Sequence, residues 1–312
     1  MRIFLWHVHG SWTTAFVQGA HDYLIPVLPD RGADGLGRAQ TWEWPSSATE
    51  VTPQQAADAE IDVIVLQRPR ELYGLAREWL GGRRPGIDVP AVYVEHNAPQ
   101  GRIADMRHPA ANRPDLTLVH VTHFNDLFWD AGVTPTRVVE HGVVDPGYRY
   151  TGELPHAAVV INEARRRARV TGTDLLPRLN GHVPIDLFGM DAAAVGGVGD
   201  PPQHELHREM ARRRVYLHPI RWTSLGLSLI EAMHLGMPVV ALATTEAPDA
   251  VPPEAGFVST NVDALAAEVR RLVSNREEAQ QRGRAARDAA LERYSLGRFL
   301  ANWDTVLEEV AG

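Results

Sequence analysis

The sequence contains a cluster of arginines that could bind a phosphate group. They lie in NEARRRARVTGTDLL, residues 162–176, which follows a predicted strand. The four side chains fall within five residues: Arg165, Arg166, Arg167 and Arg169. A guanidinium group presents a planar fork that matches two phosphate oxygens at once. The alternative is a surface loop whose charges are solvated or paired with Asp and Glu, but a strand end is where ligands bind in open α/β sheets.

A second segment, LGLSLIEAMHLGMPVVAL, residues 225–242, could bind an anion and a sugar together. Gly226 forms a turn before a short helical pattern that carries Glu231. The amides at a helix N-terminus and the helix dipole favour an anion, and a carboxylate accepts hydrogen bonds from hydroxyl groups. We expect Gly236 to end the helix in a left-handed conformation, and the apolar run after it to form a buried parallel strand.

Three strand ends in the first half of the chain carry polar residues that could bind an acceptor. They are HVHGSW with Gly10, Ser11 and Trp12, VYVEHNAP with Glu95, His96 and Asn97, and HVTHFN with His123. In the third, Thr122 is the expected N-cap of a helix that follows. A histidine can position or deprotonate a hydroxyl group near neutral pH, so His96 is our catalytic candidate. Glu95 could tune His96 or act as the base itself. The alternative is that His96 is a hydrogen-bonded structural residue.

No metal site is expected in this sequence. His7 and His9 share one face of the first predicted strand, but no third ligand follows at ligand spacing, and no Asp-x-Asp triplet is present. The chain has no cysteine, which excludes disulfides and thiolate metal sites. It also has no lysine, so its 31 basic residues are all arginine.

The elements that must position these residues alternate between apolar strands and helical stretches. Strands are expected at residues 3–8, 61–66, 91–94, 116–121 and 137–139, and then at 157–161, 185–188, 215–217, 238–242 and 256–259. Alternation of this kind predicts βαβ units with parallel sheets. The segment DPGYRYTGELP, residues 145–155, reads as a linker. The sequence therefore predicts an α/β protein of two doubly wound, Rossmann-like domains facing across a cleft.

Two further helices are expected near the C-terminus. Residues 276–293 read as a charged helix with a solvated face. Phe299, Trp303, Val306 and Val310 recur at helical spacing and form an apolar stripe. This last helix could cap its own domain or pack on the first one.

Composition limits the classes of function. The net charge of −8 argues against non-specific binding to nucleic acid. The first residues lack the length and the cleavage site of a signal peptide, and no apolar run is long enough to span a membrane. We expect a cytoplasmic protein without a transmembrane segment, and the sequence is compatible with peripheral membrane contact.

The 225–242 segment resembles the signature of retaining glycosyltransferases with the GT-B fold (glycosyl transferases group 1, family 4-like). The residues in register are Gly226, Leu227, Glu231, Ala232, Met233, Gly236, Pro238, Val239 and Val240. The resemblance implies that Glu231 binds the ribose of a nucleotide sugar and that the Gly226 and Leu227 amides face its diphosphate. Thr223 stands where the family has a first Glu, and it would border the donor sugar together with Ser224.

The resemblance extends to the arginine cluster through Gly172, Asp174, Leu175 and Leu176. It makes Arg166 the counterpart of the family's diphosphate-binding Arg, while Thr171 stands where the family has Lys. Arg167 or Arg169 could supply the missing charge.

The domains that the resemblance implies are an acceptor-binding domain at 1–150, a nucleotide-sugar-binding domain at 151–294 and a terminal helix at 295–312 that packs back on the first domain. The implied reaction transfers a sugar from a nucleoside-diphosphate sugar to a small-molecule, lipid or glycan acceptor, with retention of configuration and without a metal or other cofactor. The alternatives are a catalytically degenerate nucleotide-binding protein of this fold and a GT-B sugar-nucleotide epimerase. A dehydrogenase is disfavoured, because no Gly-x-Gly-x-x-Gly follows a strand.

Overall fold

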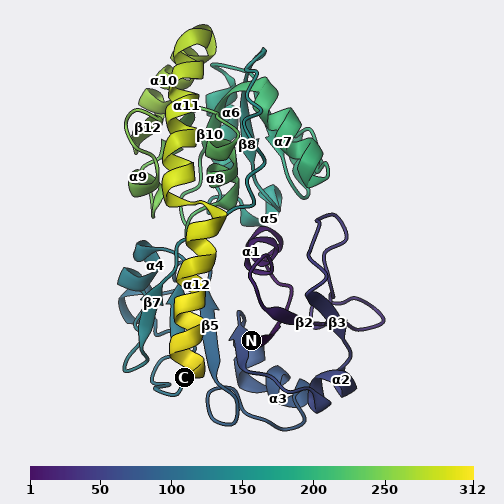
Figure 1. The fold of residues 1–312 in the computed structure, drawn as a ribbon. Coiled ribbons are helices and arrows are strands. Elements are labelled where there is room, and N and C mark those ends of the chain that lie inside the picture. The colour runs from purple at the N-terminus through teal and green to yellow at the C-terminus, as the bar shows by residue number, and fades with distance from the viewer. The chain divides into compact units, whose positions relative to one another are not determined.

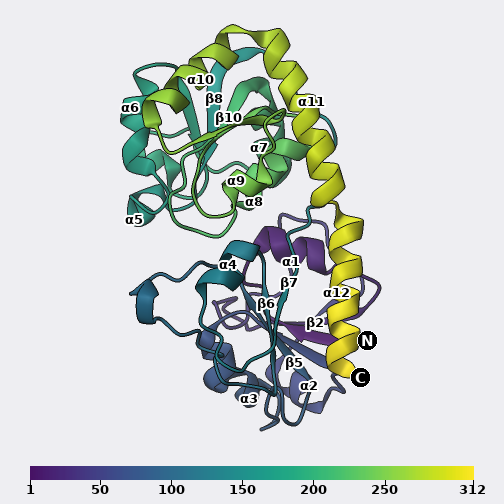
Figure 2. The same ribbon diagram turned by 90° about the vertical axis from the view of Figure 1, so that its left-hand side faces the viewer.

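The computed structural model describes residues 1–312, which divide into two compact units. The first unit comprises Met1–Val144 and Leu296–Gly312, and the second comprises Asp145–Ser295. Each unit has a parallel sheet with helices packed on it (Figures 1 and 2). The second unit begins with the segment expected to be a linker, and its first strand already includes Leu154 and Pro155. No helix combines the length and the apolar character needed to cross a membrane.

The first unit contains a seven-stranded sheet in the order β3-β2-β1-β4-β5-β6-β7, and every neighbouring pair is parallel. The strands are β1 (Arg2–Leu5), β2 (Asp22–Pro26), β3 (Ala48–Val51), β4 (Val63–Leu66), β5 (Ala91–Glu95), β6 (Thr117–His120) and β7 (Thr136–Val138). The central strands β4 and β5 are buried along their whole length, as expected for a parallel sheet covered on both faces.

Strands β2 and β3 extend one side of this sheet and were not predicted from the sequence. Strand β2 ends in Pro26, and β3 is only four residues long with two polar residues in its middle. Proline and short polar runs are weak strand signals, but both are tolerated toward the edge of a sheet. Pairing of β2 with β1, and of β3 with β2, therefore makes strands of segments that local sequence patterns do not indicate.

The helices of the first unit are short except for the last one, and two of them, α2 and α4, have side-chain caps. They are α1 (Gly10–Phe16), α2 (Pro53–Asp58), the π-helical turn η1 (Glu71–Leu75), α3 (Ala76–Trp79), the 3₁₀ turn η2 (Ile103–Asp105), α4 (His123–Phe128) and α12 (Leu296–Ala311). The backbone N–H of Asn125 donates to the Thr122 hydroxyl at 3.1 Å, so the predicted N-cap of α4 is confirmed.

Helix α12, which ends the chain, packs within the first unit. Its stripe of Phe299, Trp303, Val306 and Leu307 is buried. The Trp303 ring lies 5.7 Å from Trp12 and 5.0 Å from Phe16, with edge-to-face geometry in both pairs. The backbone of Gly142 lies so close to Phe299 that a Cβ at residue 142 would be 2.2 Å from the Phe299 Cβ. The aromatic stripe is therefore part of the core of the first unit.

The second unit contains a five-stranded parallel sheet in the order β12-β11-β10-β8-β9. The strands are β8 (Leu154–Val160), β9 (Ile185–Phe188), β10 (Arg213–His218), β11 (Val239–Leu242) and β12 (Gly256–Ser259). The helices are α5 (Ala164–Arg167), η3 (Thr173–Leu175), α6 (Leu176–Asn180), η4 (Ala192–Val195), α7 (Gln203–Arg212), α8 (Leu227–His234), α9 (Ala247–Ala250), α10 (Val262–Ser274) and α11 (Arg276–Arg293). Helices α6 and α10 share one core cluster with the sheet, and α8 contacts α7 and α11.

Helix α11 has the predicted bounds, but it is not only a solvated helix. Ala279, Gly283, Ala286 and Ala290 form a buried stripe of small residues that lies against α8. A Cβ on Gly283 would be 2.0 Å from the carbonyl oxygen of Gly236. Small residues give no strong hydropathy signal, so the sequence pattern did not indicate the close packing of α11 on α8.

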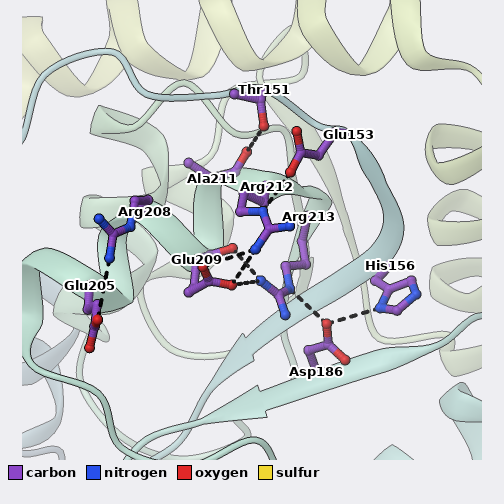
Figure 3. Close-up of polar contacts among 10 residues, drawn as sticks. All are labelled: Thr151, Glu153, His156, Asp186, Glu205, Arg208, Glu209, Ala211, Arg212 and Arg213. Carbon is purple, nitrogen blue, oxygen red and sulfur yellow. Dashed lines mark hydrogen bonds and ion pairs between the residues drawn. The ribbon is translucent and has the colours of Figure 1, made fainter.

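The amino edge of the second sheet carries a network of ion pairs, which Figure 3 shows. The buried guanidinium of Arg213 donates to Asp186 at 2.7 Å and to Glu209 at 2.6 Å, and it lies 5.0 Å over the Phe188 ring. Asp186 also accepts from His156 Nδ1 at 3.0 Å. These contacts connect β8, β9, β10 and α7, and they leave the buried charge of Arg213 fully paired.

Candidate functional site

Each sheet has a point where the strand order reverses, and ligands bind at such points beyond the carboxyl ends of the strands. In the second sheet the reversal lies between β8 and β10. Residues 161–169 follow β8, and residues 219–226 follow β10. In the first sheet the reversal lies between β1 and β4, beside β5. The topology therefore brings the arginine cluster and the Gly226 turn to one edge of the second sheet.

The arginines of the cluster differ in their partners. The Arg165 guanidinium donates to the carbonyl oxygen of Ala194. Arg166, the family counterpart by register, is ion-paired with Glu163, and its side chain is 69% exposed. Arg169 is ion-paired with Asp174 at 3.2 Å. The alternative of surface charges paired with acids therefore describes Arg166 and Arg169.

Arg167 is the exception in this cluster. It is partly buried at the last position of α5 and makes no hydrogen bond or ion pair through its side chain. Burial lowers the pKa of Arg167, and the neighbouring charge of Arg166 lowers it further, while the charge of Glu163 opposes this shift only in part. A partly buried cation without a partner is unfavourable unless an anion joins it. Arg167 is therefore the arginine of the cluster best suited to receive a phosphate.

The loops after β8 and β10 are joined by several contacts. The Arg221 guanidinium donates to the carbonyl oxygen of Arg169 at 2.8 Å and to Asp174 at 3.0 Å. Gly172 has a φ of 72°, and a Cβ there would lie 1.9 Å from the carbonyl oxygen of Pro219. Thr171 is fully buried, and its hydroxyl donates to the carbonyl oxygen of Ala168 at 3.3 Å. Thr171 therefore cannot replace the family's Lys at a ligand.

The Gly226 turn leads into α8 as expected. Gly226 is the N-cap residue, and Leu227 begins the helix, so the first amides of α8 lack partners within the helix. A Cβ on Gly226 would lie 2.8 Å from Cε1 of His218, which is buried at the end of β10. Gly236 has a φ of 85° and ends the helix, as the sequence predicts. The turn is therefore held close to the strand end, with its amides at the same edge as Arg167.

Glu231 is only 3% exposed, which the sequence did not indicate. His207 Nε2 on α7 lies 3.4 Å from Glu231 Oε2, and Gln203 Nε2 lies 2.8 Å from the same His207 nitrogen. Gln203 and His207 are four residues apart and share one face of α7. The four-residue spacing of Gln203 and His207 can be seen in the sequence. It does not indicate that Glu231 on the neighbouring helix is their partner.

Thr223 and Ser224 lie between Arg221 and the Gly226 turn. The Thr223 hydroxyl is buried and has no hydrogen-bond partner. The glycosyltransferases that this segment resembles have a Glu at this position, so the substitution removes a charge. Ser224 is buried, and its carbonyl oxygen accepts from the Thr245 hydroxyl at 2.7 Å. The two residues border the same strand end as Arg221.

In the first unit, His96 is partly buried at the end of β5, and its orientation is fixed by Gln67 at the end of β4. Gln67 Nε2 donates to the carbonyl oxygen of Trp6 at 2.8 Å, so Gln67 Oε1 faces His96 Nε2 at 3.0 Å. His96 Nε2 must therefore carry the proton, which leaves the lone pair of the neutral ring on Nδ1. The sequence analysis missed Gln67, which comes from a distant segment with no motif.

Two other histidines surround His96. The His9 ring centroid lies 4.0 Å from that of His96. Burial lowers the pKa of His96 well below its ordinary value, and the nearby His9 and His141 lower it further. Burial also lowers the pKa of His141 to about 3. His96 is therefore neutral at pH 7, and it is better suited to hydrogen-bond a hydroxyl group than to hold its proton.

The structure gives Glu95 a different place from the one expected. The backbone N–H of Ala110 donates to His108 Nδ1 at 2.9 Å, so His108 Nε2 is the donor to Glu95 Oε2, also at 2.9 Å. Glu95 Oε1 accepts from the backbone N–H of Asn97 at 2.7 Å. Glu95 is thus buried and holds the strand-end loop, while His96 contacts Gln67. We assign Glu95 no part in the chemistry.

The remaining acceptor candidates lie at the carboxyl edge of the first sheet, with one correction. Gly10 and Ser11 begin α1 after β1, and Asn97 and His123 are exposed after β5 and β6. The Trp12 side chain has no exposed surface because it packs against α12, so it cannot contact an acceptor. No group of three His, Cys, Asp or Glu side chains is placed to hold a metal ion.

Comparisons with known proteins agree with this arrangement. Residues 193–289 match the family model described as Glycosyl transferases group 1. No curated protein matches the sequence. Sucrose-phosphate synthase from Thermosynechococcus elongatus is similar in structure, with a TM-score of 0.74 and 13% identity over 99% of this chain and 98% of that one.

Two other solved structures share this similarity over nearly their whole length. HepE from Anabaena in complex with UDP-glucose has a TM-score of 0.75 and 15% identity, covering 99% of this chain and 100% of that one. A glycosyltransferase from Rickettsia africae has a TM-score of 0.66 and 12% identity, covering 99% and 98%. At these identities the likeness shows a shared fold.

Proposed function

We propose that this chain, which carries a glycosyl transferases group 1 region within a GT-B fold, transfers a sugar from a nucleoside-diphosphate sugar to a hydroxyl group of a small-molecule, lipid or glycan acceptor. The observation that carries the proposal is Arg167, a partly buried guanidinium without a partner at the reversal point of the second sheet. The similar HepE structures contain UDP and UDP-glucose, so UDP-glucose is the first donor to test.

In the proposed reaction, the bond from the anomeric carbon to the diphosphate breaks, and a bond from that carbon to the acceptor oxygen forms. The acceptor O–H bond breaks as well, and its proton passes to the departing diphosphate. The diphosphate leaves with the bonding electron pair and gathers negative charge. Arg167 and the first amides of α8 stabilise that charge, since preorganised donors are most effective where charge develops. With this charge supplied by the protein, we propose that no metal ion is required. Retention of configuration is proposed from the resemblance of the 225–242 segment.

We assign the acceptor to the first unit, with His96 as its main contact. The lone pair on His96 Nδ1 can accept a hydrogen bond from the acceptor hydroxyl group, because Nε2 is engaged with Gln67. The low pKa of the ring makes it a weak base, so its role is to orient the hydroxyl group. Gly10, Ser11, Asn97 and His123 are the further candidates for acceptor contacts.

Titration calorimetry with UDP, GDP, ADP and dTDP in the presence of EDTA tests the donor site. We expect submillimolar binding of at least one nucleotide, and binding of none would reject the assignment. A panel of nucleotide sugars then tests for donor hydrolysis and transfer. Anomeric proton couplings in the NMR spectrum of the product decide between retention and inversion. His96→Ala should reduce turnover more than donor binding, and equal turnover in variant and wild type would reject its role.

A nucleotide-binding protein without turnover is the second candidate. It is favoured by the buried Thr171 and by Thr223, whose hydroxyl group is buried, because the family has charged residues at both positions. Nucleotide binding without hydrolysis or transfer of any donor in the panel would support this candidate over the enzyme.

A further inference from the structure

We propose that His207 is a positioning residue that holds the Glu231 carboxylate in the orientation needed to bind the two ribose hydroxyls of the donor, and that Gln203 holds His207. This inference rests on the proposed function, because it requires Glu231 to bind a nucleotide ribose. It concerns two residues of α7 that neither the family resemblance nor the sequence signature includes.

The contact joins two helices of the second unit through buried groups. His207 is 7% exposed and Glu231 is 3% exposed, and 3.4 Å separates His207 Nε2 from Glu231 Oε2. Gln203, one helical turn before His207, approaches the same nitrogen at 2.8 Å. Helix α7 and helix α8 are in contact, so the backbone of each fixes one end of this chain of side chains.

The chemistry of the three groups determines the direction of the contact. A carboxylate oxygen can only accept, so His207 must present an N–H at Nε2 to Glu231. With an N–H at His207 Nε2, the Gln203 amide must be oriented with its oxygen, and not its nitrogen, at the 2.8 Å contact, where the oxygen shares that N–H. A carboxylate offers about four acceptor positions, so a contact with His207 is compatible with accepting hydrogen bonds from two vicinal hydroxyl groups.

Positioning matters here because of the burial of Glu231. A buried carboxylate is costly unless a donor faces it, and a carboxylate that can rotate would lose the geometry that two hydroxyl groups require. His207 provides the donor and restricts the rotation. Its removal should therefore weaken the recognition of ribose, while the contacts to the diphosphate should be unaffected.

The test compares UDP, GDP and ADP with their 2′,3′-dideoxy counterparts by titration calorimetry. The wild-type protein should bind its nucleotide about tenfold or more tightly than the dideoxy form, since hydrogen bonds to a charged group are strong. His207→Met removes the donor and keeps the volume, so it should reduce this preference to about threefold or less. His207→Gln keeps an N–H near the position of Nε2 and should restore most of it.

Glu231→Ala is the reference variant. It should abolish the preference for ribose, and adding His207→Met to it should have no further effect, because His207 acts through Glu231. Thermal unfolding by circular dichroism checks that each variant is folded. The inference is overturned if His207→Met keeps the full preference, or if it weakens both forms of the nucleotide equally. Binding of dTDP alone would also overturn the inference, because its sugar lacks the 2′-hydroxyl group. Failure of the wild-type protein to bind any of these three nucleotides or dTDP would reject the proposed function instead.

Discussion

Replacing Arg167 by Met separates a ligand-binding role from a structural one, because the two roles predict opposite effects on stability. Arg167 is partly buried, has no side-chain partner and has a lowered pKa, so the folded protein bears the cost of its charge. Arg167→Met removes that cost and keeps an apolar stem, so the free energy of unfolding should stay the same or rise. A structural ion pair would give the opposite result, since breaking one destabilises the fold.

Nucleotide affinity should fall in the same variant. A hydrogen bond to a charged group contributes about 1.5–3 kcal/mol, which corresponds to roughly 10- to 150-fold in the dissociation constant. Arg166→Met is the matched control, because Arg166 is exposed and already paired with Glu163. Exposed pairs contribute about 0–1 kcal/mol, so the control should lose less than about fivefold.

Titration calorimetry with the nucleotide that binds most tightly measures the affinities, and urea unfolding measures the stabilities. Equal losses of affinity in the two variants would refute the reasoning, because they would indicate a general effect of positive charge. Wild-type affinity in Arg167→Met would refute it as well.

Three further changes test other parts of the molecule. Gly226→Ala should weaken nucleotide binding about tenfold or more in calorimetry, since its Cβ would lie 2.8 Å from His218 Cε1. Gly297→Ala is the control and should bind as the wild-type protein does, because a Cβ at residue 297 meets open space. No loss of affinity in Gly226→Ala would contradict the close approach of the turn to His218. Trp303→Ala should lower the free energy of unfolding of the first unit by about 3–5 kcal/mol, as measured in urea by tryptophan fluorescence, and a loss below about 1 kcal/mol would argue against its place in the core. The pKa of His141 is lowered from 6.5 to about 3, so stability that is present above pH 6.5 is lost as the pH falls toward 3, by up to about 1.4 kcal/mol per pH unit. His141→Asn should therefore reduce the change of the urea midpoint between pH 6.5 and 5. An unchanged slope of midpoint against pH would exclude this residue as a cause.

The sequence predicted the parts of the fold that depend on local patterns. The strands at residues 185–188 and 256–259 have the predicted bounds, and Gly236 and Thr122 end and begin their helices as expected. Strands β2 and β3 were missed because pairing of β2 with β1 and of β3 with β2, and not their own composition, makes them strands. The two-sheet α/β architecture was confirmed because each sheet has several strongly apolar strands.

The site residues were harder to predict, because their roles depend on contacts between distant segments. The sequence identified the arginine cluster, but only the structure distinguishes Arg167 from its paired neighbour Arg166. Gln67 and His207 belong to no motif, and each reaches its partner from a different element of the fold. Glu95 ends β5 and contacts His108, while the next residue, His96, contacts Gln67, and the sequence does not indicate that the two side chains have different surroundings.

The network around Arg213 has a consequence for how the second unit can change over evolution. It connects three strands and a helix at the amino edge of the sheet, whereas Arg167 and the Gly226 turn follow the carboxyl ends of the same strands. Substitutions in the loops that follow the carboxyl ends of the strands therefore leave these anchoring charges untouched. Those loops have anchors of their own, because Arg221 binds Asp174 and the carbonyl oxygen of Arg169, and the buried Ser224 accepts from Thr245. A laboratory selection for new donors should therefore vary Trp222 and Thr223 and keep Arg221 and Ser224.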